Sequence, residues 1–303
     1  MTPAQTISAA DARRMQRLGI LVALAGMLLF ALNDVLGKWL VATYAVGQVL
    51  LLRSAAALVV MAPMLWRGRV RLWPLERPWL QLARVAASTF EVYAFYYAVV
   101  TMPLADVMTY WMAAPIYVAA ASPWLLRERV GPWRWAAILV GFVGVVTALR
   151  PGAEPLSLPV IASLAGSLMF GFMMLSARML RGTPDGALVF WQTAGALACG
   201  AATMGFGWVT PSAGDLGLLA LLGVVAMLAH LCVARSLKLA DAASVAPLQY
   251  TLLLWAIVFG WLVFGDVPEL AIIAGAGLIT VSGIVIWLRE SRAAGVARRR
   301  GGA

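Results

Sequence analysis

The sequence is poor in the charged residues that keep a soluble protein in water. Only 12% of its 303 residues are charged, whereas 63% are hydrophobic. A soluble domain cannot bury that much apolar surface in one core, but lipid can solvate it. The composition therefore argues against an ordinary water-soluble fold and predicts an integral membrane protein.

Residues that bind metals, form disulfides or bind nucleotides are equally scarce. Cys199 and Cys232 lie in apolar runs and form no CxxC pair, so neither a disulfide framework nor a thiolate metal site is expected. His230 is the single histidine, which argues against a zinc or haem site. No GxxxxGKS or GxxxxGKT motif occurs, which argues against ATP hydrolysis. We therefore expect no cofactor, no metal and no enzymatic activity.

Apolar runs separated by helix breakers divide the chain into ten candidate spans. A span needs roughly 20 predominantly apolar residues to cross about 30 Å of hydrocarbon. The predicted spans are residues 18–40, 46–66, 84–101, 104–126, 133–150, 158–180, 186–209, 215–237, 242–264 and 268–289. The first run is too long for the apolar region of a signal peptide and lacks a small-residue cleavage site. The predicted fold class is thus an all-α membrane protein with ten transmembrane helices.

Basic residues are distributed very unevenly among the predicted loops. With the N-terminus in the cytoplasm, 20 of the 23 lysines and arginines lie on the cytoplasmic side, Lys38 and Arg150 lie outside, and Arg53 lies within a span. The positive-inside rule then places both termini in the cytoplasm of a bacterial-type inner membrane. Because topology accounts for the formal charge of +10, we expect no nucleic-acid partner. The outer loops are short, so any binding must occur within the helices.

The two halves of the chain resemble each other. Residues 30–40 (FALNDVLGKWL) align with residues 170–180 (FGFMMLSARML), and residues 104–106 (LAD) recur at 239–241. Each half holds five spans, an odd number, so the second copy enters the membrane from the opposite side. Inverted repeats of this kind are common in secondary transporters, whose binding site lies near the midplane between the repeats. The sequence therefore predicts alternating access around a central cavity.

Four segments follow from this division. Residues 1–17 are expected to form a cytoplasmic N-terminal tail, residues 18–150 the first repeat (helices one to five), residues 158–289 the second repeat (helices six to ten), and residues 290–303 a basic cytoplasmic C-terminal tail. Because the cavity lies within one chain, we expect a monomer.

Several motifs resemble the EamA module of the drug/metabolite transporter superfamily. Residues 84–151 resemble its first copy in a tyrosine-rich third helix, Pro115 in the fourth, Glu128-Arg129 after it, and Gly141 and Gly144 in the fifth. Residues 243–288 resemble the second copy. They depart from it with Tyr250 where the module often has proline and Asp266 where it often has glutamate.

This resemblance implies a function and an arrangement of helices. The chain looks most like the YddG-type exporters of aromatic and other neutral amino acids. The alternative is a carrier of another small metabolite, such as a vitamin, a nucleoside-like compound or a drug cation. The resemblance also implies that helices one to four and six to nine surround the cavity, while five and ten are peripheral. Proton coupling and passive uniport are equally consistent with the sequence.

Polar side chains inside spans are costly in lipid and usually face protein or water. The candidate substrate-binding residues are Asn33, Glu91, Tyr110, Trp111, Trp191, His230, Gln249 and Tyr250, with Gln192 as a further candidate. Glu91 either binds a substrate amine or titrates, or it pairs with Arg53 or Arg84. His230 either senses pH or binds substrate, or it bonds to another helix. The aromatic residues suit an aromatic substrate, although packing also explains them.

Four further residues are structural or coupling candidates: Asp34, Lys38, Arg53 and Pro115. Asp34 and Lys38 are four residues apart on one helix and are expected to neutralise each other, although Lys38 can also extend to the outer interface. Arg53 either binds a substrate carboxylate or, as we favour, pairs with Glu91 or Asp34. Pro115 removes a helical hydrogen bond, which predicts a kink in the fourth helix.

Overall fold

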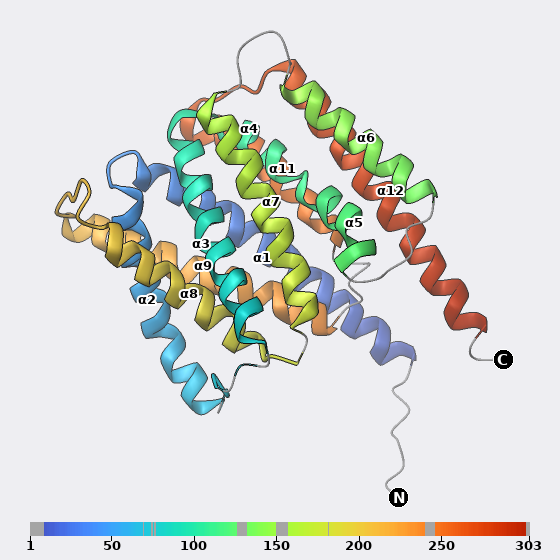
Figure 1. Ribbon diagram of the computed structural model, residues 1–303, viewed down its shortest axis with the longest axis horizontal. Coiled ribbons are helices and arrows are strands. Elements are labelled where there is room, and N and C mark those ends of the chain that lie inside the picture. Colours follow the sequence, from blue (N-terminus) through green and yellow to red (C-terminus); the bar gives the residue numbers. More distant parts are fainter. Residues whose placement is uncertain are drawn as a thin grey trace, which may run out of the picture.

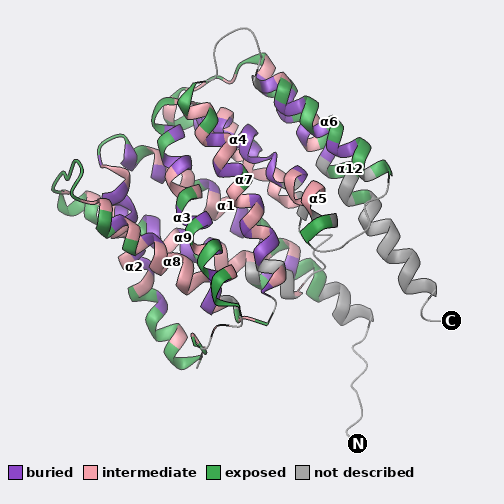
Figure 2. Cartoon of the chain, viewed as in Figure 1, coloured by how far each residue is buried: buried purple, intermediate pink, exposed green. Residues whose placement is uncertain are grey.

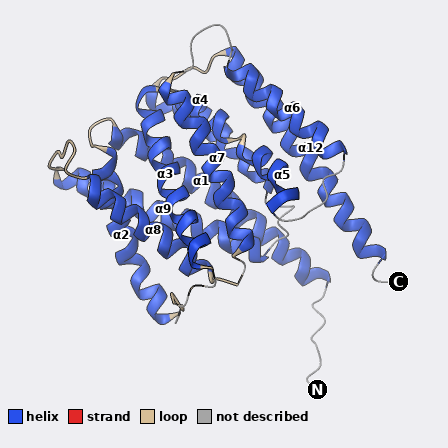
Figure 3. Ribbon diagram, viewed as in Figure 1, coloured by secondary structure: helices blue, strands red, loops and turns tan. Residues whose placement is uncertain are grey.

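The computed structural model describes residues 9–68, 70–73, 75, 77–125, 132–149, 157–180, 182–239 and 246–300, and these residues form helices and turns without any strand (Figure 3). The helices are α1 (Ala9–Val41), α2 (Val46–Arg67), α3 (Pro78–Thr101), α4 (Leu104–Trp111), α5 (Ala114–Leu125), α6 (Pro132–Leu149), α7 (Leu158–Met179), α8 (Asp185–Thr203), α9 (Ala213–Leu239), η1 (Ala246–Tyr250), α11 (Thr251–Phe259), η2 (Gly260–Phe264) and α12 (Leu270–Arg300). Glu128, Arg129 and the repeated motif at 240–241 lie outside the described residues.

Proline marks several helix starts. Pro78 occupies the first turn of α3, and Pro103 and Pro184 directly precede α4 and α8. Proline suits these positions because the first N–H groups of a helix have no intrahelical acceptor and its fixed φ matches the helix. Gly265 ends η2 with φ +71°, a left-handed conformation that favours glycine. Each of these breakers limits a helix to a length close to the predicted span.

Two helices extend beyond the predicted spans into the basic tails. α1 begins at Ala9, within the expected N-terminal tail, and α12 continues to Arg300, within the expected C-terminal tail. The segments that extend these helices are rich in alanine and arginine, which favour helix. Residues 9–17 and 290–300 are therefore helical, although hydropathy alone places them outside the first and last spans.

The exterior of the molecule is widely apolar. Four helical segments are long and apolar enough to cross a membrane, namely Met15–Val41, Val46–Arg67, Leu158–Ser176 and Ala213–Val233. Large hydrophobic side chains such as Val59 and Leu139 are 72% and 62% exposed. Figure 2 shows exposed residues spread over the outer faces of the helices, with buried residues between the helices. This pattern is typical of a protein that lipid surrounds.

Several contacts between helices have an equivalent contact when the two halves are exchanged. α1, the first helix of the first half, packs on α9, the third of the second half, and α3 packs on α7 in the equivalent way. α2 packs on α8, and α6 packs on α12 at one side of the molecule (Figure 1). Other contacts also occur as matched pairs, such as α2 with α9 and α3 with α8. The pairing therefore has the pseudo-two-fold symmetry of a duplicated fold.

α6 and α12 approach each other very closely through glycine. A Cβ atom on Gly144 would lie 2.9 Å from the carbonyl oxygen of Gly275, and one on Gly275 would lie 2.6 Å from the carbonyl oxygen of Gly144. Neither position can accept a side chain without moving the backbone of the other helix. The two peripheral helices are thus joined by the small-residue packing that membrane helices commonly use.

The fourth helix of each half is irregular. In the first half a turn at Met112 and Ala113 separates α4 from α5, and Pro115 lies in the first turn of α5. Proline cannot donate to residue i−4, so the break immediately before Pro115 has a direct cause. In the second half, α11 lies between a 3-10 turn and a π turn. The kink expected at Pro115 is therefore present as an interruption of the helix.

Two ends of the helix bundle are named here. The terminal end is where α1 and α3 begin and α2 and α12 end, and Figure 1 shows the N and C markers on that side. The far end is where α1 and α3 end and α2 and α12 begin. The largest hydrophobic cluster includes Leu50, Tyr96 and Trp111 and joins both halves near the middle and the far end.

Candidate functional site

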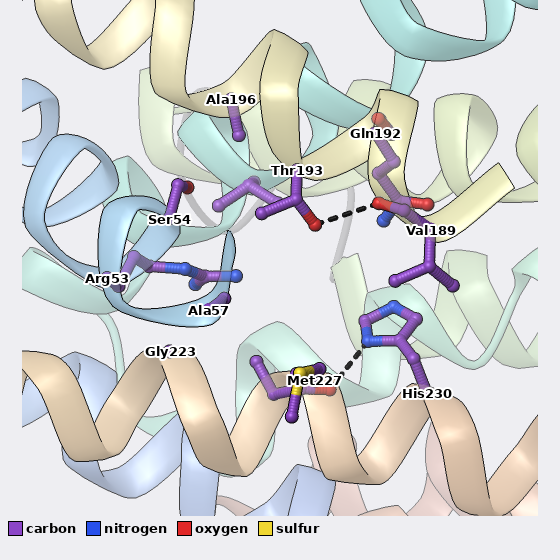
Figure 4. A pocket seen from close by; sticks show the side chains of 13 residues that line it. Arg53, Ser54, Ala57, Val189, Gln192, Thr193, Ala196, Gly223, Met227 and His230 are labelled. Carbon is purple, nitrogen blue, oxygen red and sulfur yellow. Dashed lines mark hydrogen bonds between the residues drawn. The ribbon is translucent and has the colours of Figure 1, made fainter. Parts of the chain in front are cut away.

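A small cavity lies between the two halves. Its volume is about 40 Å³, and it is lined by α2 and α3 from the first half and α8 and α9 from the second. Its polar residues are Arg53, Ser54, Ser88, Gln192, Thr193 and His230. Figure 4 shows the side chains of Arg53, Thr193 and His230 around the same space. This cavity is the position that an inverted repeat predicts for a binding site.

Arg53 is held by an aromatic residue of the third helix. Its guanidinium donates a hydrogen bond to the hydroxyl of Tyr96 and lies 5.6 Å from the centre of that ring. Tyr96 is 1% exposed, so its position is fixed by packing. Asp34 and Glu91 both interact electrostatically with Arg53. One arginine therefore faces two acidic side chains in the middle of the fold.

Glu91 and Asp34 find neutral partners. The indole Nε1 of Trp111 donates to Oε1 of Glu91 at 3.2 Å, and Nδ2 of Asn33 donates to Oδ1 of Asp34 at 3.2 Å. Trp111 can lie there because Gly166 faces it: a Cβ on Gly166 would be 2.9 Å from the indole Cζ2. Asn33, Glu91 and Trp111 thus belong to the polar cluster around Arg53. The structure shows no ion pair between Glu91 and either Arg53 or Arg84.

His230 faces the cavity from α9. Its Nδ1 lies 2.8 Å from the carbonyl oxygen of Ala226, which can only accept, so Nδ1 carries the proton. In the neutral ring Nε2 is then a hydrogen-bond acceptor. Phe30 packs its ring edge-to-face on the imidazole at 4.8 Å. The fixed ring orientation offers one acceptor to a ligand in the cavity.

Four predicted binding residues lie elsewhere. Tyr110 is 4% exposed and packs in a small cluster with Ala148 and Ile272, next to the peripheral helices. Trp191 donates its Nε1 to the carbonyl oxygen of Leu72 at 3.2 Å, beyond the end of α2. Gln249 and Tyr250 belong to η1, which does not line this cavity. These four residues therefore do not line the cavity.

The expected pairing of Asp34 with Lys38 is wrong. Lys38 forms a salt bridge with Asp266 at 2.8 Å, donates to the carbonyl oxygen of Met102 at 3.2 Å, and lies 4.6 Å from the centre of the Phe264 ring. Lys38 is one turn further along α1 than Asp34, and its long side chain reaches the turn that Gly265 creates in the other half. The Lys38 side chain is half-buried between the halves, at 13% exposed.

Further hydrogen bonds join the halves at the far end. The Tyr44 hydroxyl donates to Oδ2 of Asp215 at 2.7 Å. Gln48 binds the backbone of Val209 twice, donating from Nε2 to its carbonyl oxygen at 2.6 Å and accepting from its N–H at 3.0 Å. The bond to the Asp215 carboxylate raises the pKa of the Tyr44 phenol, so the hydroxyl stays protonated and keeps donating. The far end is closed by polar contacts between the halves.

Comparison with known proteins identifies the family of this fold. The EamA-like transporter family matches the chain twice, over residues 17–150 and again over residues 157–288. The protein belongs to the EamA-like transporter family. It is therefore a membrane transporter built from two EamA repeats, and transporters of this family are not enzymes.

Relatives of this EamA protein are named as transporters of several different substrates. A riboflavin transporter of Rhizobium johnstonii is 27% identical over 89% of this chain and 91% of its own. An S-adenosylmethionine uptake transporter of Rickettsia conorii is 22% identical, covering 93% and 97%. A pseudopaline exporter of Pseudomonas aeruginosa is 25% identical, covering 88% and 95%. A solved structure titled "Crystal structure of protein" has a TM-score of 0.66 at 17% identity, covering 91% of this chain and 99% of that one, which supports the fold alone.

Sequence reasoning missed two kinds of residue in this EamA protein. Thr193 and Ser54 line the cavity, but hydroxyl residues are common in membrane helices and give no signal of their own. Gln48 and Tyr96 make contacts between helices, which depend on how the helices pack and not on spacing along one helix. In contrast, Gln192 and His230 were binding candidates, and Arg53 was a structural or coupling candidate, because strongly polar groups within a span are rare.

Proposed function

We propose that this protein is a secondary carrier that moves a small metabolite across the bacterial cytoplasmic membrane by alternating access. The observation that carries the proposal is the polar cavity between the two halves, to which each half contributes two helices. A cavity at the boundary between two similar halves can open to one side or the other when the halves rock.

Ten transmembrane helices with both termini in the cytoplasm fit this proposal. The described helices overlap each of the ten predicted spans, with α4 and α5 together in the fourth and η1, α11 and η2 in the ninth. Five passes in each half would give the second repeat the opposite orientation. The charge distribution then assigns the terminal end to the cytoplasm and the far end to the outside.

The cavity must widen to accept a metabolite. Its volume is about 40 Å³, whereas sites for small organic ligands usually enclose roughly 300–1,000 Å³. The far end is tied by the Lys38–Asp266 salt bridge and by the bonds of Tyr44 and Gln48. With the far end on the outside, as proposed above, these contacts fit a state closed toward the outside, from which binding requires separation of the halves.

The substrate class we favour is a vitamin-like or nucleoside-like metabolite. Riboflavin and S-adenosylmethionine, named for two relatives, both join a flat nitrogen heterocycle to a chain or ring of hydroxyl groups. The cavity offers matching chemistry: donors on Arg53, an acceptor on His230, and the hydroxyl of Thr193. Phe30, which packs on His230, adds an aromatic surface beside these groups.

A neutral amino acid is the second candidate. The resemblance to amino-acid exporters suggested it, and the relatives described above carry other names. One observation favours it: Arg53 interacts electrostatically with Asp34 and Glu91, so a basic group and two acidic residues lie near one another. The relatives include both uptake and export proteins, so direction is left to the experiment.

Reconstitution into liposomes tests the proposal. Uptake of radiolabelled riboflavin, S-adenosylmethionine and phenylalanine would be measured with and without a pH gradient. We expect saturable flux of at least one of the first two, and a loss of about tenfold or more in Arg53→Gln, which removes a charged donor. Arg67→Gln is the matched control, because Arg67 is an exposed arginine at the end of α2. Flux of phenylalanine alone would favour the second candidate, and flux of none through well-folded protein would reject both.

The same assay tests proton coupling. Flux that rises with an imposed pH gradient in the wild type but not in Glu91→Gln would identify Glu91 as a proton acceptor. Equal flux with and without the gradient would indicate uniport.

A further inference from the structure

Arg84 is a buried arginine without an acidic partner. It is 6% exposed, in the second turn of α3 near the terminal end. Its Nη1 donates to the carbonyl oxygen of Leu188 at 3.4 Å and its Nη2 to Oε1 of Gln192 at 3.2 Å. It forms no salt bridge with any carboxylate of the described residues. Removing a guanidinium from water without a counter-charge is costly, and proteins rarely do so without a compensating anion.

Donors near Arg84 are also unsatisfied. The Nε of Arg84 is buried and has no acceptor within the described part of the chain. Gln81 is 3% exposed, and neither its side-chain nitrogen nor its oxygen has a partner there. Because Gln81 lies three residues before Arg84, both side chains project from the same face of α3. Two independent groups, one cationic and one amide, thus leave buried N–H donors free at one place.

This place connects directly with the cavity. Gln192, which accepts from Arg84, also lines the cavity, and so does Ser88, which lies one turn beyond Arg84 on α3. A polar stripe formed by Gln81, Arg84 and Ser88 therefore leads along α3 from the terminal end to the cavity.

We propose that Gln81 and Arg84 form an oxyanion subsite on the terminal-end side of the cavity, next to its lining residues Ser88 and Gln192, which binds the carboxylate or phosphate of the transported solute. An oxyanion would accept hydrogen bonds from the Arg84 Nε–H and the Gln81 amide and would neutralise the guanidinium. The inference rests on the proposed carrier function and narrows its substrate to compounds with an acidic group. With the terminal end in the cytoplasm, the acidic group is bound on the cytoplasmic side.

Matched pairs of solutes test the subsite in transport. S-Adenosylmethionine would be compared with decarboxylated S-adenosylmethionine, which lacks only the carboxylate, and riboflavin 5′-phosphate with riboflavin. We expect the wild type to prefer one or both members that carry the acidic group, and Arg84→Gln to raise the KM of the preferred member by roughly 10- to 100-fold. The KM of the members without the acidic group should stay within about twofold. Equal losses for members with and without the acidic group, or no loss, would overturn the proposal.

A measurement without transport separates this inference from the carrier proposal. The midpoint of thermal unfolding of the purified protein would be measured in sodium succinate, sodium phosphate and sodium chloride at equal ionic strength. We expect succinate or phosphate to stabilise the wild type and the control Arg67→Gln, but not Arg84→Gln. Gln81→Leu keeps the arginine and should show a smaller stabilisation by the same salts. This variant keeps the test decisive if Arg84→Gln fails to fold.

The outcomes distinguish the sources of the anion. Stabilisation by succinate alone indicates a carboxylate, and stabilisation by phosphate alone indicates a phosphate group. Identical behaviour of the wild type and both variants in all three salts would refute the subsite. If the salts stabilise as expected but no solute is transported, the subsite stands and the carrier proposal fails.

Discussion

The salt bridge between Lys38 and Asp266 should control opening of the far end. It is a charge-assisted contact of 2.8 Å between side chains that are 13% and 24% exposed. A hydrogen bond to a charged group contributes about 1.5–3 kcal/mol. If opening of the far end breaks it, Lys38→Gln should raise the population open at that end by roughly 10- to 150-fold.

Chemical labelling measures this opening. Ser54, which is 2% exposed and lines the cavity, would be changed to cysteine in a protein whose Cys199 and Cys232 are replaced by alanine. A membrane-impermeant maleimide added outside cells should label this cysteine about tenfold faster or more in Lys38→Gln than with Lys38 intact. Asp266→Asn should have a similar effect, because it removes the other half of the pair.

A double-mutant cycle distinguishes a latch from general loosening. If the two residues act through their mutual contact, the double variant should label no faster than the faster single variant. Effects of the two substitutions that multiply would show that each acts independently. An unchanged labelling rate in Lys38→Gln, with the same thermal midpoint as the parent protein, would refute the assigned role of the salt bridge.

Two further substitutions test the packing around the cavity. Gly223→Ala should lower the free energy of unfolding by about 1–3 kcal/mol, because a Cβ there would lie 3.1 Å from Cα of Arg53 and closer still to its carbonyl. Gly217→Ala is the control, because a Cβ there meets nothing within 4 Å. Equal thermal midpoints of the two variants would contradict the close approach at Gly223. Trp111→Phe should lower the free energy of unfolding by about 1–3 kcal/mol, because it removes the hydrogen bond to Glu91. Trp66→Phe is the control, because Trp66 is 83% exposed, and it should leave the thermal midpoint unchanged. A similar fall of the thermal midpoint in both variants would show that the bond to Glu91 is unimportant.

The positions of the helices follow closely from the sequence, whereas contacts between helices do not. Residues 46–66 were predicted as a span and form α2 up to Arg67, because hydropathy and the flanking breakers are local properties. The break before Pro115 is local as well. The partner of Lys38, in contrast, is 228 residues away in the chain, and the local rule for residues four apart selected Asp34 instead.

Arg84 illustrates why the sequence misplaces some functional candidates. Its charge marked it as the boundary of the third span, since arginine usually lies at the edge of a membrane helix. The helix in fact begins at Pro78, so Arg84 lies in its second turn and packs against α8. Burial of the guanidinium depends on the position of a helix more than 100 residues further along the chain. Arg84 was thus placed at the end of a span by its charge, whereas packing places it inside the helix bundle.

The close contact of α2 with α9 indicates how the halves can move. The backbone of α2 touches α9 at Gly223, beside the cavity, where a Cβ would lie 3.1 Å from Cα of Arg53. This contact leaves no room for α2 to slide past α9, so it should act as a pivot. The salt bridge of Lys38 lies at the far end, and Arg84 lies toward the terminal end. Rocking about the pivot would therefore release one of these two sets of contacts while keeping the other, which is the coupling that alternating access requires.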